Sequence, residues 1–228
     1  MAKFARQLWQ SSQQWRKKNA RLLLTAGSVS AGILVLRALS LLQMAELSAI
    51  DILLRLRPSE ATDERIVIIA INQKDINEYQ WPLSDQLLAE LLAKIDEQDP
   101  AAVGLDIVRD RHIGLGEEAF RSQIESMPHF VGIEALHANP DFYTKPLDVM
   151  WKTDSNGEKK EGVGFNNLVL DADGVVRRNI LYWGFEGTTR RSFALQLAQV
   201  YLSSQHGIIP EGYPSDQPKY MKLGDAIF

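Results

Sequence analysis

The sequence predicts an α/β fold, in which helices cover a mixed, partly parallel sheet, preceded by one N-terminal transmembrane helix. Two apolar runs rich in β-branched residues, RIVIIAI and AAVGLDIV, flank an amphipathic helical pattern. This order is typical of two parallel strands joined by a right-handed helical crossover. The third observation is the uncharged run LLLTAGSVSAGILVL near the N-terminus, which indicates a membrane helix.

Residues 22–44 form the predicted transmembrane helix. About 20 helical residues cross the ~30 Å hydrocarbon core of a bilayer. The segment contains one charge, Arg37, whose guanidinium can reach the nearer headgroups while its stem stays in lipid. A cleaved signal peptide and a buried core helix are the alternatives. The apolar run is longer than that of a signal peptide, so we favour an uncleaved anchor.

The distribution of charge orients this anchor. Six basic residues and no acidic residue precede Leu22, and basic flanks stay preferentially on the cytoplasmic side. We therefore expect a single-pass protein of the inner (plasma) membrane, with the lipid bilayer as a partner. Residues 1–21 are the basic cytoplasmic segment, and residues 45–228 are the extracytoplasmic domain.

Composition excludes several classes of function. Seven of the 25 Lys and Arg residues precede residue 46, so 18 remain in the domain against 29 acidic residues. Such an acidic body argues against nucleic acid as a partner, because that binding needs a basic face. The chain has no cysteine, which excludes disulfides and a cysteine nucleophile. We expect no cofactor.

Local patterns predict the elements of the first half of the domain. ELSAIDILLRL indicates a helix that continues from the membrane helix and ends before Pro58. Residues 65–71 read as a strand buried on both faces. Ser84 caps a helix with leucines at helical spacing, and Asp99-Pro100 ends it. Residues 101–108 are the second strand.

The second half begins with a helix at residues 117–126 and a third strand, HFVGIEAL. Residues 137–161 are polar and aperiodic, as functional or mobile loops are. GVGFNNLVL and VVRRNILYWGF then flank a hairpin turn at Asp171, Asp173 and Gly174, since Asp-Gly readily adopts the positive φ that such turns need. Ser192 begins the last helix. MKLGDAIF reads as the start of a further strand, so we expect the domain to be truncated at its C-terminal end.

Taken in order, several of these pieces resemble the CHASE2 family, the extracytoplasmic sensor domains of bacterial transmembrane receptors. The matching pieces are AELSAIDILLRLRP, RIVIIAIN, QWPLSDQLLAELLAKI, PAAVGLDIV, GVGFNNLVLDADGVVRRNILYW and SFALQLAQVYL. The hairpin DADGVVRR followed by SFALQLA is the most specific part. Asn72, Leu83 and Ser84 depart from the family's pattern, which weakens any transfer of function to that loop.

The resemblance implies a sensory input domain of a membrane-bound signal-transduction receptor rather than an enzyme. It also implies an unknown small-molecule or protein stimulus, a homodimer, and an output module such as a kinase or cyclase beyond this chain. The alternative is an extracytoplasmic, membrane-anchored metal-dependent hydrolase that uses Asp106, Asp110 and His112. Its metal ligands would be Asp106 and His112, and one Asp and one His do not make a metal site, so we predict no metal and no catalytic residue.

Five residues are candidates for ligand binding. Asp106 ends the second strand and Arg109 follows it, at the carboxyl edge where open α/β sheets bind ligands. The alternative for Asp106 is a buried carboxylate that caps a turn. Trp81 precedes a helix N-terminus and is either an exposed ligand lip or a residue packed over the sheet edge.

Arg177 and Arg178 complete this set. Side chains alternate along a strand, so one should face inward and pair with a carboxylate such as Asp106, or bind an anion, while the other is solvated. Asp171, Asp173 and Gly174 are read as a structural turn. A calcium loop would need ligands where Val175 and Tyr182 stand.

Overall fold

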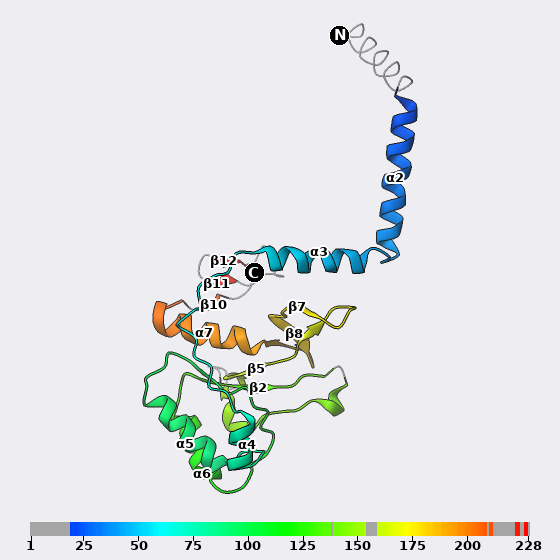
Figure 1. The fold of residues 1–228 in the computed structure, drawn as a ribbon. Helices are drawn as coiled ribbons and strands as arrows, with labels where there is room; N and C mark the ends of the chain where they lie inside the picture. The colour runs from blue at the N-terminus through cyan, green and yellow to red at the C-terminus, as the bar shows by residue number, and fades with distance from the viewer. Residues whose placement is uncertain are drawn as a thin grey trace. The chain divides into compact units, whose positions relative to one another are not determined.

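The structure is a computed structural model, and it describes residues 19–137, 139–153, 159–208, 210–211, 222–223 and 226–227. The chain divides into two compact units, residues 1–68 and residues 69–228, and each is described by itself. Figure 1 shows the order of the elements along the chain. Most of the predicted basic segment, residues 1–18, lies outside the described residues.

The first unit begins with α2 (Ala20–Ala38), a helix of 19 residues with a mean hydropathy of 1.4 in its most apolar window and no buried part. By length and composition it could cross a membrane. The predicted helix over residues 22–44 is wrong in its end, because α2 stops at Ala38 and a second helix, α3 (Gln43–Leu56), starts after four intervening residues.

A C-terminal cap causes this interruption. Ser40 has a φ of 59°, and its N–H donates to the Arg37 carbonyl at 2.9 Å. The N–H of Leu41 donates to the Leu36 carbonyl at 3.0 Å. These two bonds and the left-handed residue form a Schellman motif, which terminates a helix. The expectation that α3 continues from the membrane helix is therefore wrong, whereas its end before Pro58 is confirmed.

The predicted first strand at residues 65–71 is also wrong. Ile66, Val67, Ile68 and Ile69 are 56–84% exposed, and no ladder in the described part of the chain includes them. The run therefore leads as an extended segment into a helix that the pattern analysis did not predict, α4 (Gln73–Tyr79). Asn72 and Asp75 begin α4 with a reciprocal capping box.

The second unit is built on a parallel sheet with the strand order β1-β2-β5. Its strands are β1 (Val103–Gly104), β2 (Phe130–Glu134) and β5 (Val163–Phe165). The α/β class and the partly parallel sheet are thus confirmed, but the parallel pairs are β1–β2 and β2–β5 rather than the predicted pair of residues 65–71 with residues 101–108. The antiparallel strands do not extend this sheet, however, but form separate ribbons.

Helices cover both faces of the sheet (Figure 1). The helices α5 (Asp85–Asp96) and α6 (Glu117–Ser126) pack on one face, and α7 (Phe193–His206) packs on the other. Serine hydroxyls cap α5 and α7 as predicted, because Ser84 accepts from the Leu87 N–H and Ser192 accepts from the Leu195 N–H, each at 3.3 Å.

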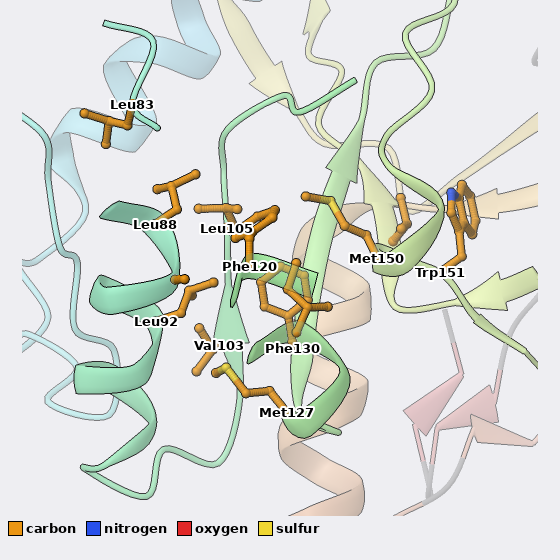
Figure 2. Close-up of a cluster of buried hydrophobic side chains, with 13 residues drawn as sticks. Leu83, Leu88, Leu92, Val103, Leu105, Phe120, Met127, Phe130, Met150 and Trp151 are labelled. Atoms are coloured by element: carbon orange, nitrogen blue, oxygen red, sulfur yellow. The ribbon is translucent and has the colours of Figure 1, made fainter. Parts of the chain in front are cut away.

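The larger core lies between the sheet and the α5–α6 face (Figure 2). It comprises Leu83, Leu88, Ala89, Leu92, Val103, Leu105, Phe120, Ile124, Met127, Phe130, Met150, Trp151 and Val163. Side chains alternate along β1 and β2, so their remaining residues face α7. There Gly104 lies against Phe193 and Leu197.

Two hairpins follow the sheet. The first joins β6 (Val169–Leu170) to β7 (Val176–Arg178) through the predicted Asp-Gly turn, with Gly174 at a φ of 79°. The second joins β8 (Tyr182–Phe185) to β9 (Thr188–Arg191). Its turn residues, Glu186 and Gly187, both have positive φ, as a two-residue hairpin turn requires. VVRRNILYWGF is therefore two strands, not one.

Short elements occupy the remaining segments. Within residues 137–161 the structure has two 3₁₀ turns and a ribbon: η1 (Pro140–Phe142), η2 (Asp148–Met150), β3 (Lys152–Thr153) and β4 (Lys159–Glu161). Near the C-terminus, β10 (Pro210–Glu211), β11 (Lys222–Leu223) and β12 (Ala226–Ile227) pair antiparallel. The predicted further strand in MKLGDAIF is thus two short strands.

Candidate functional site

Polar side chains gather where the three parallel strands end. Glu134 is the last residue of β2, Asn166 directly follows β5, and Asp106 follows β1 by two residues. The Asn166 amide donates to Asp106 Oδ1 at 3.2 Å, and the Asn166 backbone N–H donates to the Glu134 carbonyl at 3.3 Å. Asp106 is exposed and lies at the carboxyl edge, where α/β sheets usually bind ligands.

Glu134 is the most unusual residue of this edge, because its charged side chain is only 1% exposed. Its Oε2 accepts a hydrogen bond from the Tyr143 hydroxyl at 2.7 Å. Its Oε1 is also buried and has no hydrogen-bond partner among the described residues. A buried carboxylate needs compensation by hydrogen bonds or by a cation, and here Oε1 has no hydrogen bond among the described residues.

Arg190 of β9 supplies the nearest positive charge. Its Nε lies 3.9 Å from Glu134 Oε1, which is beyond hydrogen-bonding distance. Its guanidinium carbon lies 5.0 Å from the centre of the Trp151 ring, in a cation–π arrangement. The Nε of Arg190 and the Nε1 of Trp151 are both buried and, within the described ranges, unpartnered. Two donors and one acceptor are therefore unsatisfied within one cluster.

Burial dominates the acid–base behaviour of this cluster. Desolvation raises the pKa of Glu134, and the Tyr143 hydrogen bond and the Arg190 charge oppose this only in part. Burial, together with the hydrogen bond to Glu134, also raises the pKa of Tyr143, so the phenol stays protonated at neutral pH. Both pKa values are thus raised chiefly by burial of the side chains.

Arg109 does not belong to this edge, although the sequence predicted it as a ligand residue. Its side chain is 1% exposed, and its Nη2 donates to the Leu83 carbonyl at 2.5 Å and lies 3.6 Å from Asp85 Oδ1. Burial lowers the pKa of Arg109, while Asp85 and Asp110 raise it. Arg109 thus holds the N-terminus of α5 from within the protein and is not available to a ligand.

Asp85 is the centre of that internal network. It is fully buried, and besides Arg109 it contacts His112 Nδ1 at 2.6 Å and accepts from the Ile113 N–H at 3.3 Å. The other ring nitrogen of His112 lies 3.4 Å from Glu117. Asp85 therefore fixes the orientation of an imidazole whose far side approaches α6.

A polar cavity of about 480 Å³ opens beside His112. It is formed by the loop after β1, the first turns of α6 and the segment around η2. Charges of both signs line it, and Lys145 pairs with Asp148 at 3.0 Å. Such a wall suits a small polar molecule. The lining residues are Asp110, His112, Glu117, Arg121, Lys145, Pro146, Leu147, Asp148 and Val149.

The structure does not bring together the metal ligands that the hydrolase alternative needs. His112 contacts Asp85 and Glu117, whereas Asp106 is bonded to Asn166. In the described part of the chain, no group of three or more His, Asp or Glu side chains is placed to hold a metal ion.

Trp81 is 52% exposed, which agrees with the exposed-lip interpretation in position only. The free N–H groups expected beside it are absent, because the first turn of α5 is capped. The backbone N–H of Asp85 donates to the Ile113 carbonyl at 2.8 Å, and the backbone N–H of Gln86 donates to the Leu115 carbonyl at 2.7 Å. Of the ligand-lip interpretation, the exposed Trp81 is therefore confirmed and the free N–H groups are not.

Arg177 and Arg178 are used within their own hairpin. As predicted, one is buried and the other is solvated, at 5% and 70% exposure. Arg177 pairs with Asp173 at 2.6 Å and with Asp171 at 3.2 Å, and Arg178 also pairs with Asp171. The prediction that the buried arginine pairs with Asp106 is wrong. Arg177 lowers the pKa of Asp173 to about 2, and Arg178 and Arg177 lower the pKa of Asp171.

Sequence reasoning missed the Glu134 cluster. One signal was present: a glutamate inside the apolar strand HFVGIEAL must be buried if the strand is. Its partners, Tyr143, Trp151 and Arg190, come from a loop, the residue after a 3₁₀ turn and an unpredicted hairpin. No local pattern connects them.

Comparison with known proteins gives one match. A family model described as the CHASE2 domain matches residues 28–226, nearly the whole chain. No curated protein and no solved structure matches.

Proposed function

The chain belongs to the CHASE2 domain family, and from this we propose that it is the extracytoplasmic input domain of a membrane-bound signal-transduction receptor. The observation that carries the proposal is the family match over residues 28–226, since CHASE2 domains are sensory extracytoplasmic domains rather than catalytic ones. The bacterial inner membrane is the proposed location.

An N-terminal anchor supports this placement. In the proposal α2 crosses the membrane, with the basic segment before it in the cytoplasm and the second unit outside. The helix is apolar, fully exposed and followed by an α/β unit with its own core, as a tethered domain should be.

The carboxyl edge of the parallel sheet and the cavity beside His112 are the proposed regions of stimulus contact. Both follow parallel strands, and both present polar groups of mixed charge. In a sensor, the stimulus needs a differential affinity for two arrangements of the domain, worth about 1–3 kcal/mol.

We also propose that α2 mediates a homodimer. Gly27 and Ala31, and likewise Ser28 and Gly32, are four residues apart, which places small side chains on one face of the helix. Replacing Gly32 with Leu should reduce the yield of cross-linked dimer when the receptor in membranes is treated with an amine-reactive cross-linker, since the chain has no cysteine. Unchanged cross-linking would reject this interface.

The topology can be tested with two reporters fused after Phe228. Alkaline phosphatase is active only outside the cytoplasm. Green fluorescent protein fluoresces in the cytoplasm but stays dark when it is exported across the membrane in unfolded form. We expect active phosphatase and dark fluorescent protein. A matched control lacking residues 20–38 should reverse both signals. Fluorescence from the intact anchor fusion would overturn the proposal.

The sensing role needs a separate measurement. In the complete receptor reconstituted in vesicles, deletion of residues 69–208 should abolish the response of the output to the stimulus. A response that survives this deletion would show that the domain is not the input.

A further inference from the structure

We propose that Glu134 is a proton-binding site, through which external pH acts as a stimulus on this domain. The inference rests on the proposed sensory function, because it names the chemical class of the stimulus. The reaction is simple: above the transition the carboxyl group releases its proton to water and becomes a carboxylate, and below the transition it takes the proton back.

Geometry makes the ionised form of Glu134 costly. The side chain is 1% exposed, one of its oxygens is bound by a neutral phenol, and the other has no hydrogen-bond partner within the described ranges. The Arg190 Nε at 3.9 Å is too far to bond it. The raised pKa of Glu134 is the expected result of this burial.

Two polar side chains lie beside the Glu134 carboxyl group, and the Asn166–Asp106 pair lies at the same edge of the sheet. Tyr143 belongs to the loop after β2, and Arg190 belongs to β9. Glu186, in the turn before β9, acts on Tyr143 through its charge. Trp151, after η2, is neutral, and its ring makes a cation–π contact with the guanidinium of Arg190. Among these groups, Glu134 is the buried carboxyl, so protonation changes the charge at the centre of the cluster.

Ionisation should move Arg190. A carboxylate at Oε1 attracts the unpartnered Nε–H of Arg190, and a charge-assisted bond would require closing the present 3.9 Å to about 2.8 Å. The guanidinium would then shift on the Trp151 ring. The proton thus selects between two positions of one side chain.

That movement has a direct route into the fold. Arg190 is two residues before Ser192, the N-cap of α7, and Ser192 also bridges to Phe165 of β5. A shift of β9 therefore acts on the start of α7, the helix that packs over the sheet. Arg190, whose Nε lies 3.9 Å from Glu134 Oε1, is thus joined to the start of α7 by continuous backbone.

The test is a pH titration of tryptophan fluorescence, from pH 4 to 9, on the full chain in detergent micelles. The wild type should show one transition with its midpoint above 4.5, the ordinary value for glutamate. E134Q should abolish it, because the amide accepts from Tyr143 but does not titrate. W151F should lose the fluorescence change and keep the pH dependence of Tm.

Tyr143→Phe provides a second, graded variant. The Tyr143 hydrogen bond favours the ionised carboxylate, so its removal should raise the midpoint by about half to one pH unit. An unchanged midpoint in both E134Q and Tyr143→Phe, or no transition in the wild type, would overturn the proton site. These outcomes are independent of the reporter fusions, so a failed titration with the expected topology rejects this inference alone.

Discussion

Gly164 of β5 lies against the backbone of Phe193, the first residue of α7. A Cβ built on Gly164 would approach the Phe193 Cα to 2.5 Å and its nitrogen to 2.6 Å. Backbone atoms cannot move aside as a flexible side chain can. The packing of α7 against the sheet therefore requires glycine at position 164.

Gly164→Ala should destabilise the second unit by about 1–3 kcal/mol, the usual effect of overpacking a close contact. Urea denaturation measures this change. The matched control is Gly184→Ala on β8, where a Cβ would meet nothing within 4 Å. Equal midpoints for the two variants would show that α7 does not pack on Gly164.

Arg109→Met should lower the free energy of unfolding by about 3 kcal/mol, because it leaves the fully buried Asp85 without its cation. Arg111→Met is the control, since Arg111 is exposed and surface substitutions usually change stability by less than about 0.5 kcal/mol. Chemical denaturation of both variants compares them. A mild effect of Arg109→Met would mean that this arginine faces solvent.

Asp173→Asn should flatten the loss of stability in acid. Arg177 lowers the folded-state pKa of Asp173 from 3.8 to about 2. This contribution is fully present above pH 3.8 and disappears as the pH falls through about 2. A series of Tm values from pH 2 to 6 would show the change, with Asp141→Asn as an exposed control. Parallel curves for the wild type and Asp173→Asn would contradict the pairing.

Ile68→Lys should leave the unfolding midpoint nearly unchanged and reduce aggregation, because Ile68 is exposed within an apolar, β-branched run. Ile133→Lys is the matched control and should prevent folding, since Ile133 is buried in β2. Thermal unfolding and light scattering report the two effects. If Ile68→Lys also unfolded the protein, residues 65–71 would be the buried strand that their composition predicts.

Local chemistry explains which elements the sequence predicted well. The caps at Ser84 and Ser192 and the turn at Gly174 depend on residues within a few positions of one another. The same reasoning failed for residues 65–71, where burial depends on a partner strand far along the chain. It also missed the second hairpin, because Glu186 adopts a positive φ without a strong preference for it.

The candidate site was harder to predict for a related reason. Asp106 could be placed at the sheet edge from its position after a strand. Arg109 could not be assigned from sequence, because whether it turns toward Asp85 or toward solvent is decided by the packing of α5. The pairing of Glu134 with Tyr143 and Arg190 joins three elements in space and has no counterpart in spacing.

The turn at Ser40 has a mechanical consequence. A single unbroken helix transmits rotation and axial displacement along its whole length. Two helices joined by a capped turn share no axis, so twisting α3 does not twist α2. A force on α3 instead acts on α2 through the turn, as a displacement of the C-terminal end of α2.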